Sequence, residues 1–358
     1  MNQTFEPIKI GTITLDNPLG LGAGIIKHEH NLGDILKSEA ALIEIGSFTK
    51  AAREGNSGEV YFNPANSLFS LNAMGLPGPS MKESIEEIAK LVKRIQLSGK
   101  KVLISVAGMS ASEHFQLAIM ASSTGADGVV INLGCPNVYA LGDQKPIQSY
   151  DIACIREVIG HCETLRSGNP RFTIILKLSP FAFGKAELRL GNIDNTLGIE
   201  GYMFKLNNRA FFDSVKLVPE ITKALNATNA IDAVITANTL GGVSITHNGV
   251  EILNFSDGTS PGKNQGGLAG PILNELMLSQ VWNWRELLKP EIAIIACGGI
   301  RTGANMKAAL DAGASACQIV SAYAQKLTND DAEIGKKEAA SVFSTMLVEY
   351  MDASVEKE

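Results

Sequence analysis

The sequence predicts an α/β protein built as a (β/α)8 TIM barrel, with enlarged βα loops over the C-terminal face. Eight short apolar, β-branched runs recur along the 358 residues. The runs are continuously apolar rather than alternating, as in parallel strands that are buried on both faces. Helix-like or glycine-rich stretches separate most of them, and polar segments mostly follow directly after the runs, where a barrel carries its functional loops. A doubly wound parallel sheet is the alternative that this pattern allows.

The positions of these runs define the expected strands. We place them at Asn17–Leu21, Ala41–Ile45, Val102–Val106, Gly128–Asn132, Thr173–Leu178, Ala233–Ala237, Ile292–Ala296 and Ala316–Ile319. Apolar residues at helical spacing between the runs predict helices over Met81–Leu97, Ser112–Thr124 and Gly303–Ala312.

Two connections are longer than a barrel needs, near residues 50–100 and 181–231. Neither has the apolar periodicity that an independent core requires. We therefore interpret residues 1–358 as one barrel domain with two insertions over its mouth, rather than as two domains.

The composition excludes several classes of protein. Hydrophobic residues make up 45% of the chain, which is not typical of a disordered protein. The net charge is −6 without basic clusters, which argues against nucleic acid or an anionic membrane as the main partner. The start, MNQTFEPIKI, has no signal-peptide pattern, and the 5 cysteines form no CxxC pair. We therefore expect a cytoplasmic protein without a zinc site or a disulfide framework.

Glycine pairs late in the chain indicate a phosphate site. Gly266-Gly267 follows the sixth predicted strand after a long loop, Gly298-Gly299 ends the seventh, and Ser321 follows the eighth. Glycine lets backbone N–H groups approach an anion closely, and the last two βα loops are the usual phosphate site of such barrels. Tight turns are the alternative explanation for these glycines.

Two lysines at strand ends suggest a flavin. Lys177 lies within the apolar run TIILKLSP, and Lys50 follows the second predicted strand in GSFTK. Burying a lysine without a partner is costly, and a reduced flavin supplies negative charge near N1 that a cation stabilises. A solvated Lys50 and a Lys177 that extends its ammonium to water are the alternatives.

A cysteine and several amides suggest the reactive part of the site. Cys135 follows the fourth predicted strand in NLGCPNV, and a loop cysteine with a suitable pKa can act as a base. Converging amides would suit a planar substrate with amide and carboxylate groups. The polar residues at this and other strand ends are Asn72, Asn132, Asn137, Asn238 and Thr239. Taken singly, each has a simpler explanation as a packed cysteine or a turn-forming residue.

Taken together, these motifs resemble the dihydroorotate dehydrogenase family over most of the chain, from about Pro7 to Tyr323. The resemblance depends on segments that occur in order and at barrel-compatible spacing. They are NP at Asn17–Pro18, TKAAREGN at Thr49–Asn56, NAMGLPG at Asn72–Gly78, SVAGMSASE at Ser105–Glu113, NLGCPNV at Asn132–Val138, LKLSP at Leu176–Pro180, ANT at Ala237–Thr239, GGLAG at Gly266–Gly270 and CGGIRTG at Cys297–Gly303.

The resemblance implies an FMN enzyme that oxidises (S)-dihydroorotate to orotate in pyrimidine biosynthesis. Cys135 would remove the C5 proton while hydride passes from C6 to flavin N5. A cysteine base without an apolar N-terminal extension corresponds to the soluble class 1 enzymes. These divide into homodimers that use fumarate and complexes that reach NAD through an FAD- and iron–sulfur-bearing subunit. NAMGLP is more similar to the fumarate branch, and a homodimer is expected, while the inserted loops leave the acceptor open.

The same resemblance assigns the site residues one by one. Catalytic roles go to Cys135 and Lys50, and no metal ligand is implied. Substrate-binding roles go to Lys50, Asn72, Met74, Gly75, Leu76, Asn132, Asn137, Asn238 and Thr239. FMN-binding roles go to Ala23, Gly24, Thr49, Lys50, Ser105, Asn132, Lys177, Gly266, Gly267, Gly298, Gly299, Val320 and Ser321.

Some segments depart from the family pattern. GLGAG stands where the family usually has Ala-Ser-Gly, so a flavin-contacting hydroxyl is missing at Ala23. Gly78 replaces the usual asparagine, and Val320-Ser321 replaces the usual Gly-Thr. The loop after Cys135 and the region 181–231 are longer than in the family.

Two alternatives to dihydroorotate oxidation stay open. A related flavin barrel that acts on another dihydropyrimidine, such as dihydrouracil, would have no substrate carboxylate for Lys50 to bind. A non-catalytic barrel that binds flavin or phosphate would account for the altered GLGAG segment and the long insertions.

Overall fold

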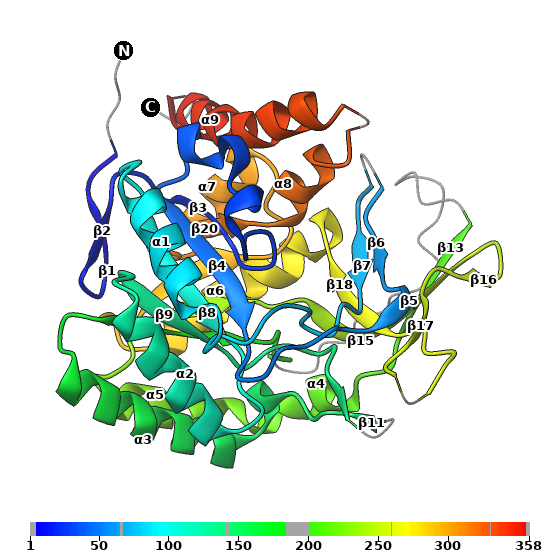
Figure 1. The fold of residues 1–358 in the computed structure, drawn as a ribbon, viewed down its shortest axis with the longest axis horizontal. Helices are drawn as coiled ribbons and strands as arrows, with labels where there is room; N and C mark the ends of the chain where they lie inside the picture. Colours follow the sequence, from blue (N-terminus) through cyan, green and yellow to red (C-terminus); the bar gives the residue numbers. More distant parts are fainter. Residues whose placement is uncertain are drawn as a thin grey trace.

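The computed structural model describes residues 5–64, 67–140, 143–183, 201–258, 260–329 and 331–355. At its centre, eight parallel strands form a closed barrel with helices around it (Figure 1). In order around the barrel they are β3 (Leu19–Leu21), β4 (Leu42–Phe48), β8 (Lys101–Val106), β9 (Gly128–Asn132), β12 (Thr173–Leu178), β14 (Ala233–Thr236), β19 (Ala293–Cys297) and β20 (Ala316–Ile319). β20 pairs with β3 and closes the ring, so the predicted barrel and all its strands are confirmed and the doubly wound alternative is wrong.

Some of the outer helices begin at residues whose side chains satisfy free N–H groups of the first turn. Ser110 accepts from the N–H of Glu113 at the start of α2, and Thr302 forms a capping box with Asn305 at α7. The predicted helices are confirmed as α1, α2 and α7, although α1 begins later than Met81. The helices are α1 (Ile85–Gln96), α2 (Ala111–Ser123), α3 (Ile152–Gly168), α4 (Arg209–Asp213), α5 (Val218–Ala227), α6 (Asn274–Leu287), α7 (Gly303–Asp311), α8 (Ser321–Lys326) and α9 (Ala332–Val355).

The barrel interior changes from apolar to polar along its axis. A buried cluster fills the lower part with Leu42, Leu103, Val130, Ile175, Ile295 and Ala316. Side chains two residues apart on a strand point to the same face. The next inward positions toward the C-terminal end are therefore Glu44, Ser105, Asn132, Lys177, Cys297 and Gln318. We call these six residues the upper layer, and they form the floor beneath the barrel mouth.

A hairpin closes the lower end of the barrel. Its strands are β1 (Ile8–Ile10) and β2 (Ile13–Leu15), and the side chains of Ile10, Ile13 and Leu15 belong to the same apolar cluster as the lower barrel.

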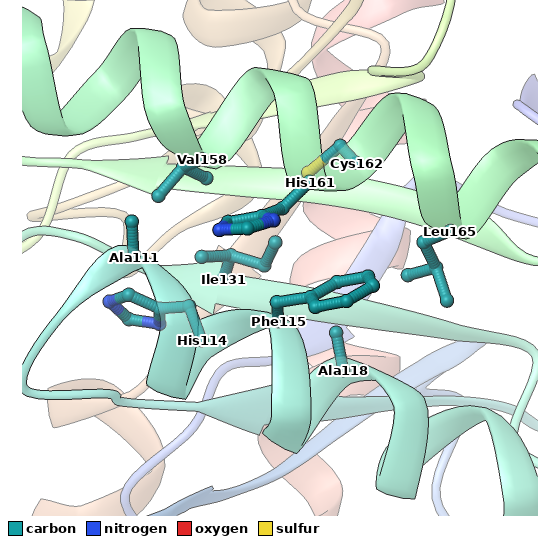
Figure 2. A pocket seen from close by; sticks show the side chains of 9 residues that line it. All are labelled: Ala111, His114, Phe115, Ala118, Ile131, Val158, His161, Cys162 and Leu165. Atoms are coloured by element: carbon teal, nitrogen blue, oxygen red, sulfur yellow. The ribbon is translucent and has the colours of Figure 1, made fainter.

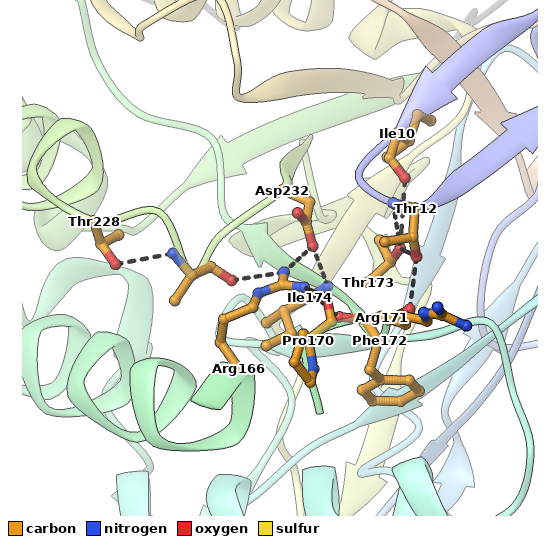
Figure 3. Close-up of polar contacts among 11 residues, drawn as sticks. Ile10, Thr12, Arg166, Pro170, Arg171, Phe172, Thr173, Ile174, Thr228 and Asp232 are labelled. Atoms are coloured by element: carbon orange, nitrogen blue, oxygen red, sulfur yellow. Dashed lines mark hydrogen bonds and ion pairs between the residues drawn. The ribbon is translucent and has the colours of Figure 1, made fainter. Parts of the chain in front are cut away.

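Polar contacts fix this lower end to the outer chain (Figure 3). Arg166, near the end of α3, donates to the carbonyl oxygens of Phe172 and Ala230 and forms an ion pair with Asp232. Asp232 also accepts from the N–H of Ile174 at 2.7 Å. The base of the barrel is thus joined across α3, β12 and the segment before β14.

A second, smaller sheet stands beside the barrel mouth, at the right in Figure 1. Its strands are β6 (Tyr61–Phe62), β7 (Ser70–Asn72), β13 (Tyr202–Leu206), β15 (Leu240–His247), β16 (Val250–Glu251) and β18 (Gly266–Ala269). Phe69, Leu71, Phe204, Ile245 and Leu268 form its apolar core. Both expected insertions contribute strands, and neither builds this core alone. Residues 184–200 of the second insertion lie outside the described residues.

The remaining short elements are turns and two-stranded pairs at the periphery. They are η1 (Glu29–Asn31), η2 (Gly33–Lys37), η3 (Gln148–Tyr150), η5 (Ser214–Lys216), η6 (Pro271–Leu273), β5 (Ser57–Glu59), β10 (Tyr139–Ala140), β11 (Asp143–Gln144) and β17 (Asn254–Ser256).

Candidate active site

A cavity of about 660 Å3 opens at the C-terminal ends of the barrel strands. Its size is within the range of cofactor and substrate sites. Its lining includes Lys27, His28, His30 and Lys177, and no aspartate or glutamate of the described chain lines it. A cavity with lysines and without carboxylates favours an anionic ligand.

Most of the residues predicted from the sequence lie together in this cavity. The lining includes Ala23, Gly24, Asn72, Met74, Gly75, Leu76, Asn132, Cys135, Asn137, Lys177, Asn238, Thr239, Gly298, Gly299, Val320 and Ser321. They come from loops and strand ends that are far apart in the sequence, and the closed barrel brings them to one mouth.

Five predicted residues lie outside the lining, and each has another structural role or position. The Oγ1 of Thr49 donates to the carbonyl oxygen of Ala51, and Lys50 is exposed to solvent. Ser105 lies in the upper layer, where its Oγ is 2.7 Å from Oγ of the cavity residue Ser47. The other two are Gly266 and Gly267, which lie in β18 of the second sheet.

Close strand packing accounts for this glycine pair. A Cβ at Gly267 would meet the Thr239 side chain at 2.2 Å, and a Cβ at Gly266 would meet the Asn72 carbonyl oxygen at 2.6 Å. The pair therefore lets β18 approach two residues of the cavity. Further along, Ala269 and Gly270 line the cavity in its place.

The asparagines form two linked pairs in the cavity wall. Asn238 donates to Asn132 Oδ1 at 2.9 Å, and Asn132 in turn donates to Ser47 Oγ at 3.1 Å. Asn137 donates to Asn72 Oδ1 at 2.9 Å, and Asn72 donates to the Gly267 carbonyl oxygen at 3.2 Å. The mutual hydrogen bonds orient the amides, so they act as a preformed polar wall rather than as independent turn residues.

Lys27 is the mouth lysine that the sequence reasoning missed. It lies in the loop after β3 and lines the cavity, and its Nζ donates to the Pro77 carbonyl oxygen. Burial lowers the pKa of Lys27, and the nearby Cys135 thiolate opposes that effect. The available signal was its position in GLGAGIIKHEH, the loop that also carries Ala23 and Gly24. Lys27 therefore brings to the cavity mouth a lysine ammonium that the exposed Lys50 does not supply.

Cys135 lies in the cavity wall with cations on several sides. Burial raises the pKa of the Cys135 thiol. The pKa is lowered by the backbone N–H of Asn137 and by the positive charges of three side chains, because all of them stabilise the thiolate. The three side chains are those of Arg53, Lys145 and Lys27. Arg53 is held by its Nε, which donates to the Gly75 carbonyl oxygen at 2.9 Å.

A buried histidine connects the loop of Cys135 to α2. His114 Nδ1 accepts from the N–H of Gly108 at 3.1 Å, and its Nε2 is 2.9 Å from Gln148 Oε1 in η3. Because Nδ1 is the acceptor, Nε2 carries the proton and donates to Gln148. Burial lowers the pKa of His114 to about 4, so the ring is neutral at physiological pH.

The hollow between α2 and α3 is a different kind of feature (Figure 2). His114, Phe115, His161 and Cys162 line it together with aliphatic residues, and it has no room for a water molecule. The His161 ring stacks on Phe115 with centroids 4.8 Å apart. This hollow is a packing contact between two helices.

The floor of the cavity contains a buried ion pair. Lys177 Nζ is 3.5 Å from Glu44 Oε2, with side-chain exposures of 6% and 0%. Burial by itself lowers the pKa of Lys177, but the charge of Glu44 and its hydrogen bond to Lys177 raise the pKa above its usual value. Lys177 is therefore charged, and it presents an ammonium to the cavity from below.

These residues fit an FMN molecule. The ammonium of Lys177 suits the negative charge of a reduced flavin ring, and the absence of carboxylates among the described lining residues suits a phosphate. Gly298 and Gly299 have φ values of 131° and 73°, which favour glycine. A Cβ at Gly24 would meet nothing within 4 Å, so its backbone faces open space in the cavity. Buried Gln318 adds an amide whose side-chain atoms have no partner among the described residues.

The fold and the cavity define a barrel protein with a site for an anionic, nucleotide-sized ligand at the strand ends. A family model described as dihydroorotate dehydrogenase matches residues 7–332. The chain belongs to this family, whose members are FMN flavoproteins and oxidoreductases.

Relatives of two descriptions match most of the chain. The NAD(+)-type dihydroorotate dehydrogenase B catalytic subunit of Endomicrobium trichonymphae is 26% identical over 87% of this chain and 84% of its own length. The corresponding subunit of Methanopyrus kandleri is 25% identical over 90% and 86%. A putative dihydroorotate dehydrogenase A (fumarate) of Streptococcus pyogenes is 27% identical over 89% and 87%. The NAD(+)-type and fumarate-type relatives match this chain with similar identity, so the comparison does not assign it to one of the two types.

No helix within the described ranges combines the length and the apolar character needed to cross a membrane.

Proposed function

We propose that this chain oxidises dihydroorotate to orotate with FMN as its cofactor and Cys135 as the base. The observation that carries the proposal is the placement of the Cys135 thiol in one cavity with Lys27, the linked asparagines and Lys177. A base, a cation for a carboxylate, amides for a planar ring and a cation for a flavin are the groups that this reaction needs.

FMN would be held at the floor and at the far wall of the cavity. Lys177 would lie beside the flavin ring, and the backbone of Gly298 and Gly299 would lie along the phosphate together with Val320 and Ser321. Bound FMN would supply the acceptor for the hydride that leaves C6 of the substrate.

The substrate would lie between the polar wall and Lys27. The ammonium of Lys27 would bind the carboxylate in place of Lys50, which is exposed and does not line the cavity. Asn72 and Asn137 would bind one part of the ring, and Asn132 and Asn238 would bind another. Their mutual hydrogen bonds fix the amide orientations before the substrate arrives, which lowers the entropic cost of positioning.

Cys135 would take the C5 proton onto its Sγ as the C5–C6 double bond forms. The thiolate is the basic form, and the cations around it counteract the effect of burial on its pKa. The proton transfer at C5 and the departure of hydride from C6 together remove two hydrogens and two electrons, which converts dihydroorotate into orotate.

The test is anaerobic reduction of the FMN-loaded protein by dihydroorotate, which is measured as bleaching of the flavin absorbance. We expect rapid bleaching with dihydroorotate and little with dihydrouracil, which has no carboxylate for Lys27. Bleaching by dihydrouracil alone would support the related dihydropyrimidine enzyme. FMN binding without reduction by either compound would support the non-catalytic barrel and overturn the proposal.

The acceptor and the assembly belong to the same proposal. We infer that this single-domain chain forms a cytoplasmic homodimer and uses fumarate as its electron acceptor. The NAMGLP segment is the basis for fumarate as the acceptor. The alternative is a complex that reaches NAD through an FAD- and iron–sulfur-bearing subunit, which the names of two relatives motivate. Fumarate-dependent reoxidation of the reduced protein supports the first, and its failure supports the second.

A further inference from the structure

Glu44 is a buried acid that the proposed reaction does not use. It lies in β4 in the upper layer, its side chain is fully buried, and its Oε2 contacts Lys177 at 3.5 Å. Its Oε1 has no hydrogen-bond partner among the described residues. A buried carboxylate with an unpaired oxygen is costly, so its presence calls for an explanation.

Stability does not explain this ion pair. Replacing a buried pair with apolar residues of similar volume is often neutral or stabilising. The layer directly below it is apolar, with Leu42 below Glu44 and Ile175 below Lys177. Apolar residues could therefore have continued the packing upward.

The pair spans the barrel, and only one of its members reaches the cavity. β4 and β12 are separated by β8 and β9 around the ring, so the two side chains meet across the interior. Lys177 lines the cavity and Glu44 does not. Glu44 can therefore affect a bound ligand only through Lys177 or through its own electric field.

The surroundings contain few other charges. Besides Glu44 and Lys177 themselves, the titratable group that acts on the pair is Cys297 on β19. Burial raises the pKa of the Cys297 thiol, which keeps the thiol neutral. The other members of the upper layer, Ser105, Asn132 and Gln318, are uncharged. In such surroundings the charge of Glu44 is weakly screened.

We propose that Glu44 is a positioning residue that holds the Lys177 ammonium at the cavity floor and limits the positive charge that a bound flavin ring meets. The proposal rests on the proposed FMN site. Reduced flavin is negative near N1, so a nearby cation favours the reduced form and a nearby anion opposes it. Glu44 would thus hold the reduction potential of the bound FMN below the value that Lys177 alone would give.

The test is the reduction potential of bound FMN in the full-length chain, measured against a reference dye. We expect Glu44→Gln to favour the reduced form by about tenfold, which is about 30 mV for a two-electron couple. The shift should be larger toward acidic pH, because an unpaired buried ammonium loses its proton as the pH rises. Glu44→Asp keeps the charge and should restore a potential close to that of the wild type.

Glu44→Ala provides a second variant if Glu44→Gln does not fold, because it leaves space for water beside Lys177, and the same upward shift is expected. A purely structural role for Glu44 would weaken the binding of oxidised and reduced FMN equally and leave the potential unchanged. That result would overturn the inference. If the wild-type chain binds no FMN at all, the proposed function itself fails, which is a separate outcome.

Discussion

The two ends of the barrel use polar residues in opposite ways. At the lower end, Arg166 and Asp232 bond to several backbone groups and to each other. At the upper end, Glu44 Oε1 and both amide atoms of Gln318 are buried without partners in the described chain. Arg166 Nε is also buried without a partner in the described chain, but the other nitrogens of Arg166 hold segments of the lower end together. The unpartnered atoms of the upper layer instead lie beneath a cavity.

This difference separates stability from function along one axis. Active sites of such barrels lie at the C-terminal face, while the opposite face contributes to stability. A change at the lower end should therefore lower the free energy of unfolding without altering the chemistry. A change at the upper end should alter binding or catalysis directly, and its effect on unfolding depends on whether it leaves a buried charge without a partner.

The largest effect is expected at Cys135. Cys135→Ser replaces a thiol with a far weaker acid, so the hydroxyl is rarely ionised and cannot take the C5 proton efficiently. Reduction of bound FMN by dihydroorotate should slow by at least about a hundredfold. Stopped-flow absorbance measures the rate, and thermal unfolding and FMN titration should match the wild type. A rate within a few-fold of the wild type would remove Cys135 from the role of base.

At the lower end, the largest effect is expected at Asp232. Asp232→Ala leaves Arg166 without its carboxylate and the N–H of Ile174 without its acceptor. The free energy of unfolding in urea should fall by about 3 kcal/mol. Asp213→Ala is a matched control, since Asp213 pairs with the exposed Arg209 and should cost less than about 0.5 kcal/mol. Equal losses in the two variants would contradict a specific role for the lower network.

Lys27 and Lys50 provide a direct comparison at the upper end. Lys27→Met should raise the KM for dihydroorotate about tenfold or more, because the carboxylate loses its cation. Lys50→Met should leave the KM unchanged, since that side chain is exposed and outside the cavity. Steady-state kinetics on both variants decides between them. A loss confined to Lys50→Met would restore the assignment that the family resemblance implies.

The pH dependence of the reaction is a smaller, graded effect. Burial raises the pKa of Cys135, and the thiolate is the active form, so the reductive rate should increase with pH. The increase should be about tenfold per pH unit below the pKa of the thiol. Lys145→Gln removes one stabilising cation and should move the profile toward higher pH. A flat profile would show that the ionisation of Cys135 does not control this step.

The barrel could be predicted from the sequence because each strand is buried on both faces. Runs such as Thr173–Leu178 are short, rich in β-branched residues and without polar alternation, and this local pattern favours a parallel strand. The second sheet could not be predicted in this way. Its strands are short, and β7 pairs with β18 from almost two hundred residues away, so no local signal encodes the pairing.

Which residues line the cavity could be predicted where the residue follows a barrel strand directly. Asn132, Cys135 and Lys177 are examples, since the closed ring brings strand ends to one mouth. Lys50 and Lys27 show the limit of this rule, because the direction in which a loop leaves the barrel decides which lysine lies in the cavity. Glycine pairs show another limit. A pair that approaches a neighbouring strand, as Gly266-Gly267 does, has the same sequence as one that approaches a phosphate.

The smallest effect tests whether the two ends are energetically separate. Thr12, in the turn between β1 and β2, donates through Oγ1 to the Arg171 carbonyl oxygen at 2.7 Å. Thr12→Val should lower the free energy of unfolding by about 1 kcal/mol, the usual net value of one hydrogen bond. Thr14→Val, at an exposed position of β2, should have almost no effect. Because the apolar layers lie between Thr12 and the upper layer, the FMN affinity and potential should not change. A weaker FMN affinity in Thr12→Val would show that the lower end is coupled to the cavity, and the separation of stability from function along the barrel axis would then be wrong.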